Sequence, residues 1–101
     1  MRILFYTYSR VDYGADLLYD GLCRILGSEN VVEQPIKPTL HGQPTGIYRW
    51  YPDLFNYPVQ EKAGKFDIIL FACRAPGQKQ IPIPEDMPDL PLFLVALVNQ
   101  E

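Results

Sequence analysis

The polar stretch that follows the first apolar run carries residue types suited to holding a ligand. Residues 2–8, RILFYTY, are almost entirely apolar and aromatic. The next segment supplies the candidates, namely Ser9, Arg10, Asp12, Tyr13 and Gly14. Hydroxyl and carboxylate groups can hydrogen-bond a small polar molecule, and a guanidinium can neutralise an anion. We predict contact with a small polar or anionic ligand at these positions, without a bond-breaking step.

A second arginine follows another apolar run. Residues 66–72, FDIILFA, have the character of a buried strand, and Cys73 and Arg74 come directly after it. In open parallel sheets, ligands bind beyond the carboxyl ends of the strands, where the strand order reverses. With strands in the order 2-1-3-4, that point lies between the first and third strands. Arg74 would then join the Ser9–Gly14 segment at one edge of the sheet.

The same residues also have an ordinary structural interpretation. Ser9 or Asp12 would cap the N-terminus of the following helix, and the arginines would be solvated. The glycine-rich sequences GxGxxG and GxxxxGK[ST], which cradle phosphates, do not occur in the chain. We therefore predict no cofactor.

Two further residues have side chains that take part in catalysis elsewhere. Cys73 stands beside Arg74, whose charge could lower the pKa of the thiol and make it a nucleophile. The single histidine, His41, lies in a proline-rich segment, where we expect it to be exposed or to contact a ligand. A packing role for Cys73 is the alternative. With two cysteines and no CxxC, the chain also lacks a zinc-binding pattern. We predict no metal site and no catalytic set.

Residues 13–26 carry the clearest helical pattern in the chain. Apolar residues recur at helical spacing, namely Ala15, Leu18, Tyr19, Leu22, Ile25 and Leu26. The polar residues Asp16, Asp20 and Arg24 fall on the opposite side, which predicts that they face solvent. Gly27 follows the pattern at the position where a left-handed residue commonly ends a helix.

Four segments have the length of strands. Residues 2–8, 66–72 and 90–96 are nearly continuous apolar runs, and residues 30–34, NVVEQ, form a shorter candidate strand. Runs without polar alternation are typical of parallel strands that are buried on both faces. We predict an α/β fold with a small parallel sheet of about four strands in the order 2-1-3-4, one main helix and proline-rich loops, resembling half of a flavodoxin-like or Rossmann-like domain.

The prolines leave one face of this sheet without a helix. All ten lie beyond residue 34, so we expect no long helix in residues 34–65 or 74–89, and at most a helical turn near residues 51–56. We consider three coverings for that face: a second copy of the chain, a further part of a longer protein, or the chain's own aromatic residues. The last are Tyr48, Trp50, Tyr51, Phe55 and Tyr57.

Length and charge exclude several classes of protein. The 101 residues, of which 48% are hydrophobic and 21% charged, suit a single α/β domain spanning residues 1–101, or a piece of a longer protein. A net charge of −3 argues against general binding to nucleic acid. No apolar run approaches the roughly 20 residues that cross a bilayer, and no secretory signal is visible. We predict a cytoplasmic protein.

The first 42 or so residues also contain a family-like pattern. An opening strand is followed by D-x-L-x-x-G-L-x-x-x-L-G, then V-V, an acidic residue and a proline. The matching residues are Asp16, Leu18, Gly21, Leu22, Leu26, Gly27, Val31, Val32, Glu33 and Pro35. This pattern resembles the N-terminal Rossmann-like half of GT-B type glycosyltransferases, in which that half shapes the acceptor side and the C-terminal half holds the nucleotide sugar.

The resemblance implies a catalytically incomplete domain, a C-terminal domain as its partner, and a sugar or phosphorylated small molecule as its ligand. We expect no catalytic activity from the chain alone. Two alternatives stay open. One is an interaction module that forms a homodimer through its helix-poor face, and the other is a thiol enzyme that uses Cys73.

Overall fold

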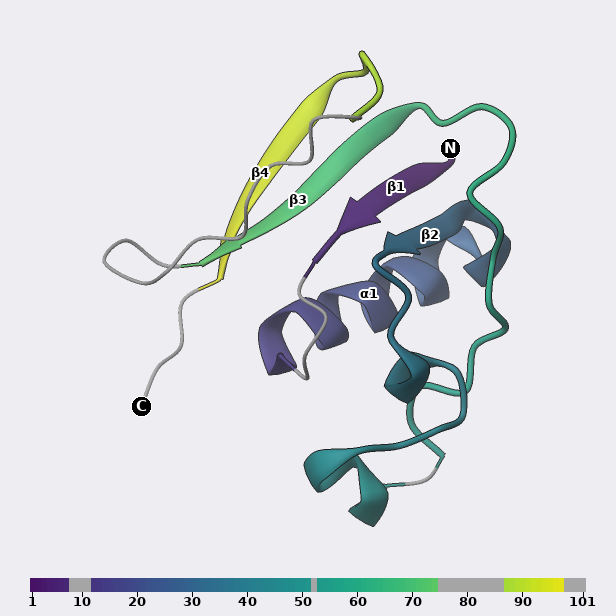
Figure 1. Ribbon diagram of the computed structural model, residues 1–101, viewed down its shortest axis with the longest axis vertical. Helices are drawn as coiled ribbons and strands as arrows, with labels where there is room; N and C mark the ends of the chain where they lie inside the picture. The colour runs from purple at the N-terminus through teal and green to yellow at the C-terminus, as the bar shows by residue number, and fades with distance from the viewer. Residues whose placement is uncertain (8–11, 52, 75–86, 98–101) are drawn as a thin grey trace.

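The computed structural model shows a four-stranded sheet with one α-helix against it (Figure 1). The structure describes residues 1–7, 12–51, 53–74 and 87–97. The strands and the α-helix are β1 (Ile3–Tyr6), α1 (Tyr13–Leu26), β2 (Val31–Gln34), β3 (Ile68–Arg74) and β4 (Leu92–Leu97). Short 3-10 helices are η1 (Ser28–Asn30), η2 (Pro38–Leu40) and η3 (Gly46–Trp50). Among the described residues, no helix is long and apolar enough to cross a membrane.

The sheet has the predicted topology. Its order is β2-β1-β3-β4, and every neighbouring pair is parallel. Phe5 in β1 lies opposite Glu33 in β2 and Leu70 in β3. The carboxyl ends of β1 and β3 are therefore neighbours, as the predicted ligand position requires.

The third strand is longer at its carboxyl end than the sequence pattern predicted. We expected it to end at residue 72, so that Cys73 and Arg74 would begin a loop. Instead β4 pairs with β3 as far as Arg74, opposite Leu97. Pairing with a second apolar strand extends β3 because each added residue gains backbone hydrogen bonds.

Helix α1 has the predicted bounds and caps. The Asp12 Oδ1 accepts a hydrogen bond from the Ala15 N–H at 3.2 Å, which confirms Asp12 as the N-cap. Gly27 ends the helix with a φ of 89°, and a Cβ built there would stand 2.6 Å from a Glu29 carboxylate oxygen. Asp20 and Arg24 form the expected i, i+4 ion pair at 2.8 Å.

The predicted faces of α1 are wrong at two positions. Asp16, expected in solvent, is 1% exposed, and Ile25, expected in the core, is 81% exposed. The line of α1 that is buried runs through Ala15, Tyr19 and Cys23. The loop after β2 packs on the side of this line that carries Asp16, so the buried face is rotated away from Ile25.

Two apolar clusters lie on opposite faces of the sheet. On the α1 face, Phe5 stacks on Tyr19, and Leu40, Tyr48 and Phe55 from the loop after β2 join the same cluster. The predicted aromatic covering therefore packs on the helix side, while Trp50 and Tyr51 are exposed. The short helices of this loop, η2 and η3, also precede the predicted position at residues 51–56.

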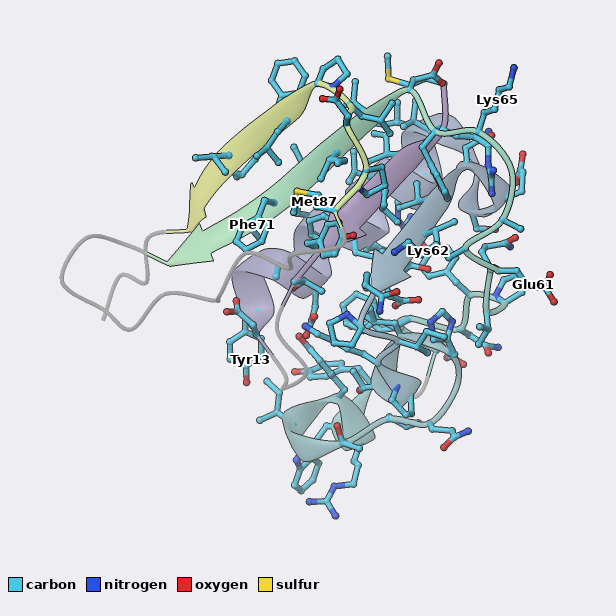
Figure 2. All side chains as sticks on the ribbon, turned by 45° about the horizontal axis from the view of Figure 1, so that its top comes forward. Tyr13, Glu61, Lys62, Lys65, Phe71 and Met87 are labelled. Carbon is cyan, nitrogen blue, oxygen red and sulfur yellow. The ribbon has the colours of Figure 1, made fainter. Side chains whose placement is uncertain are left out.

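The face without a helix is not bare over β1, β2 and β3. Its buried residues are Leu4, Tyr6, Val32, Ile69 and Phe71. Phe66, Met87 and Leu90, which precede β3 and β4, pack against them. Figure 2 shows Met87 close to Phe71 on this side. The edge strand β4 differs, because Leu92, Phe93 and Leu94 are 41%, 54% and 62% exposed.

Candidate functional site

The candidate site is the carboxyl edge of the sheet, where β1 ends and α1 begins. Ser9 and Arg10 lie outside the described residues. Asp12 caps α1, Tyr13 and Gly14 form its first turn, and Arg74 is the last residue of β3. The topology thus brings the described members of the predicted set to one edge, and their contact with a ligand stays a prediction.

The carboxylates at the start of α1 are engaged with the protein. The Asp12 carboxylate caps the helix, and the Asp12 N–H donates to Asp16 Oδ2 at 3.0 Å. Two carboxylates therefore already compensate the positive end of the helix dipole. An anionic ligand at this edge would have to be neutralised by other cations, such as the arginines predicted to line it.

A buried ion pair fastens the loop after β2 to the first turns of α1. The Lys37 Nζ lies 2.7 Å from Asp16 Oδ1, and both side chains are 1% exposed. The Tyr48 hydroxyl donates to Asp16 Oδ2 at 2.9 Å. Burial first, and the Asp16 charge second, raise the pKa of Tyr48. Asp16 thus has three donors and acts as an anchor for the loop.

A second acid–base pair ties the same loop to the sheet. The His41 Nε2 lies 2.6 Å from Glu33 Oε1, and His41 Nδ1 lies 2.7 Å from the Tyr57 carbonyl oxygen. The two side chains are 5% and 2% exposed. The prediction of an exposed His41 is wrong, because Glu33 inside β2 requires a buried partner.

Thr7 contributes a polar group that sequence reasoning missed. Its N–H donates to the Gln34 carbonyl at 3.0 Å, which continues the β1–β2 ladder by one residue. Strand alternation then places its side chain on the α1 face with Ile3 and Phe5. Thr7 is 3% exposed, and its Oγ1 has no hydrogen-bond partner among the described residues. A buried, unpaired hydroxyl is unusual in a native protein.

Exposed aromatic rings lie at the start of α1 and at the end of η3. Tyr13 is 48% exposed, and its ring packs edge-to-face on Tyr48 at 5.8 Å between centroids. Trp50 and Tyr51, next to Tyr48 in the chain, are 81% and 57% exposed. We call Tyr13, Trp50 and Tyr51 the aromatic surface. Figure 2 shows Tyr13 well away from Lys62 and Lys65.

A shallow groove of about 450 Å³ lies elsewhere, between the segments that precede β3 and β4. It is lined by Lys62, Gly64, Lys65, Phe66, Pro88, Asp89 and Leu90. The Lys62 Nζ lies over the Tyr6 ring, 5.8 Å from its centroid. Because lysines and a carboxylate both line the groove, its charge favours no one class of ligand.

Comparison with known proteins assigns no family. No family model, no curated protein and no solved structure matches this chain. Within the described ranges, no group of three or more His, Cys, Asp or Glu side chains could hold a metal ion.

Proposed function

We propose that this chain binds a small hydroxyl-bearing molecule, a sugar or a phosphorylated sugar, at the carboxyl edge of its sheet and catalyses no reaction on its own. The observation that carries the proposal is the Tyr13 ring, which is half exposed at the first turn of α1 and supported by the buried Tyr48. Binding sites of this kind combine aromatic surface with a few polar groups.

The unpaired Thr7 hydroxyl supports a polar ligand at this edge. A buried hydroxyl without a partner costs free energy, which a hydrogen bond from a ligand would recover. The two engaged carboxylates, Asp12 and Asp16, favour a neutral sugar. A phosphorylated sugar would draw its counter-charge from Arg10 and Arg74, and Ser9 and Gly14 would complete the site.

This proposal agrees with an acceptor-side half of a GT-B type glycosyltransferase that requires a C-terminal domain to hold the donor. The parallel sheet with order 2-1-3-4 suits such a half. Three residues of the family-like pattern have defined structural roles: Asp16 binds Lys37, Gly27 ends α1, and Glu33 binds His41.

The test is a titration of the isotope-labelled chain, followed by amide chemical shifts. The probes are glucose, glucose 1-phosphate and UDP-glucose. We expect shifts at the start of α1 and about fivefold weaker binding for Tyr13→Ala, because one aromatic contact contributes about 1 kcal/mol. Phe93→Ala is the matched control, since Phe93 is similarly exposed, at 54%, but lies on β4.

Thr7→Val separates ligand binding from folding. The Thr7 Oγ1 has no partner among the described residues, so its loss should not lower stability. The same variant should bind the ligand more weakly. If the folded protein responds to none of the three probes, the proposal is wrong.

The exposed apolar edge of β4 favours a second candidate, a homodimer. Leu92, Phe93 and Leu94 project from both faces of an edge strand, which is a common template for pairing. The inner strands of the helix-poor face are covered, so a dimer would use β4 instead. Light scattering over a hundredfold range of concentration tests this, and Phe93→Lys should abolish the dimer. A monomer throughout the range removes the candidate.

A further inference from the structure

The two hydrogen bonds of the His41 ring determine how many protons the Glu33–His41 pair holds. A carbonyl oxygen only accepts hydrogen bonds, so the 2.7 Å contact with Tyr57 requires a proton on His41 Nδ1. The other contact, 2.6 Å between His41 Nε2 and Glu33 Oε1, then needs one more proton. That proton belongs to an imidazolium facing a carboxylate or to a carboxylic acid facing a neutral imidazole.

Any other proton count is unfavourable at this geometry. Without the shared proton, a lone pair of His41 Nε2 faces a negatively charged Glu33 oxygen in a buried site. With an additional proton, a buried imidazolium faces a neutral acid and has lost its counter-charge. Burying an unpaired charge is costly, so the contact is stable with one shared proton.

The groups around the pair offer no other source of that proton. From α1, Tyr19 and Cys23 carry buried neutral groups, and Asp20 accepts from the Tyr57 hydroxyl and from Arg24. From the loop, Lys37 is paired with Asp16. The second Glu33 oxygen, Oε2, has no hydrogen-bond partner among the described residues. Burial is the largest influence on the pKa of Glu33 and raises it. The charges of His41 and Lys37 lower that pKa, but the net change is an increase.

We propose that Glu33 and His41 form a proton-dependent latch that holds the loop after β2, described over residues 35–51 and 53–57, against β2 and α1 and opens when rising pH removes the shared proton. The latch acts where the two arms of this segment meet, because the Tyr57 N–H donates to the Leu40 carbonyl and the Gly42 N–H donates to the Phe55 carbonyl. The same segment carries Tyr48, which supports Tyr13. Opening of the latch should therefore also weaken ligand binding at Tyr13. That effect on binding rests on the proposed function, whereas the latch itself does not.

The direction of the pH dependence follows from the two states. In the unfolded chain, a glutamate titrates near about 4.3 and a histidine near about 6.5. Above about pH 6.5 the open segment holds no proton on these groups, whereas the closed latch holds one. The equilibrium constant for closing should therefore fall about tenfold for each pH unit above about 6.5, until the closed pair itself loses its proton. The raised pKa of Glu33 acts in the same direction, because its proton is retained in the folded state and lost as pH rises.

The experiment measures amide hydrogen exchange at Gly42 and Tyr57 in the full chain between pH 5.5 and pH 9, corrected for intrinsic exchange. We expect protection to fall about tenfold per unit above pH 6.5. In Glu33→Gln, the side-chain amide donates to His41 Nε2 without a shared proton, so protection should become flat above about pH 6.5. Arg24→Ala, which changes an exposed charge on α1, should keep the wild-type slope.

The ring nitrogens of the single histidine give a second measurement that does not depend on any variant. At the low end of the range both nitrogens should show hydrogen bonds, and the Nε2 hydrogen bond should be lost together with the amide protection. A flat exchange profile for the wild type, an unchanged slope in Glu33→Gln, or an Nε2 hydrogen bond that persists after the amides have lost protection would each overturn the latch.

Discussion

Breaking the buried Asp16–Lys37 pair should cost more than breaking any exposed pair of the chain. The Nζ–Oδ1 distance is 2.7 Å, and both side chains are 1% exposed. At an effective dielectric constant of about 20, this distance corresponds to an attraction of about 6 kcal/mol. Removing both charges from water costs several kcal/mol for each ion, so the intact pair contributes little net stability. When a substitution removes one partner, the remaining buried charge still carries its desolvation cost but has lost the attraction that offset it.

The two single variants should differ because the surviving partners differ. In Lys37→Met, Asp16 keeps the Tyr48 hydroxyl and the Asp12 N–H, so we expect a loss of about 3 kcal/mol. In Asp16→Ala, the buried ammonium of Lys37 keeps no acceptor within the described part of the chain. We expect a loss of about 5 kcal/mol for that variant. The double variant leaves no unpaired charge and should be more stable than Asp16→Ala alone.

The assay is urea denaturation followed by far-UV circular dichroism of α1, with all four proteins in one buffer containing a stabilising osmolyte. The osmolyte keeps the weakest variant folded, because a domain of this size has only about 5–15 kcal/mol of stability. Asp20→Ala and Arg24→Ala form the control cycle, in which coupling should be near zero because the Arg24 side chain is 68% exposed. If Asp16→Ala and Lys37→Met add within about 0.5 kcal/mol, the reasoning is refuted.

Three further experiments test other features of the fold. In thermal unfolding, Gly27→Ala should lose at least about 1 kcal/mol of stability, because the φ of 89° and the nearby Glu29 both oppose a side chain. Gly21→Ala, where a Cβ would have no atom within 4 Å, should gain about 0.5–1 kcal/mol, and equal effects of the two variants would contradict this. Ile25→Gln should leave the unfolding midpoint unchanged, since this residue is 81% exposed; a core-sized loss would contradict the rotated face of α1. Burial raises the pKa of the Cys23 thiol to about 11, so at pH 8.5 iodoacetamide should alkylate the folded protein at Cys23 about a hundredfold more slowly than in urea, as followed by peptide mass spectrometry. If the alkylation rate of Cys73, measured against pH in the same digests, follows a pKa of about 8.5, the thiol-enzyme hypothesis has no support.

The regular elements could be predicted because local rules determine them. Asp12 and Gly27 delimit α1, and nearly continuous apolar runs identify β1, β3 and β4. The position of Asp16 could not be predicted in this way. Helical periodicity marks it as polar and outward, and its burial depends on Lys37 and Tyr48, which are 21 and 32 residues further along the chain.

Glu33 differs from Asp16, because its burial could have been inferred from the sequence. It lies two residues after Val31 in a strand pattern, so alternation places it on the same face as an apolar side chain. A buried carboxylate requires a partner of opposite charge or a shared proton, and Lys37 and His41 are the nearest candidates that follow in the chain. The identity of that partner still depends on the path of the loop.

The two buried pairs explain how a loop with few regular backbone hydrogen bonds is fixed in place. Its prolines remove donors, and its apolar contacts come mainly from Leu40, Tyr48 and Phe55. Lys37 binds an acid on α1 and His41 binds an acid on β2, so the loop is fastened to both layers of the fold. The two pairs have no residue in common, and only the Glu33–His41 pair shares a proton. A rise in pH should therefore release the loop from β2 while Lys37 still holds it to α1. Amides near His41 should then lose protection at lower pH than those of η3.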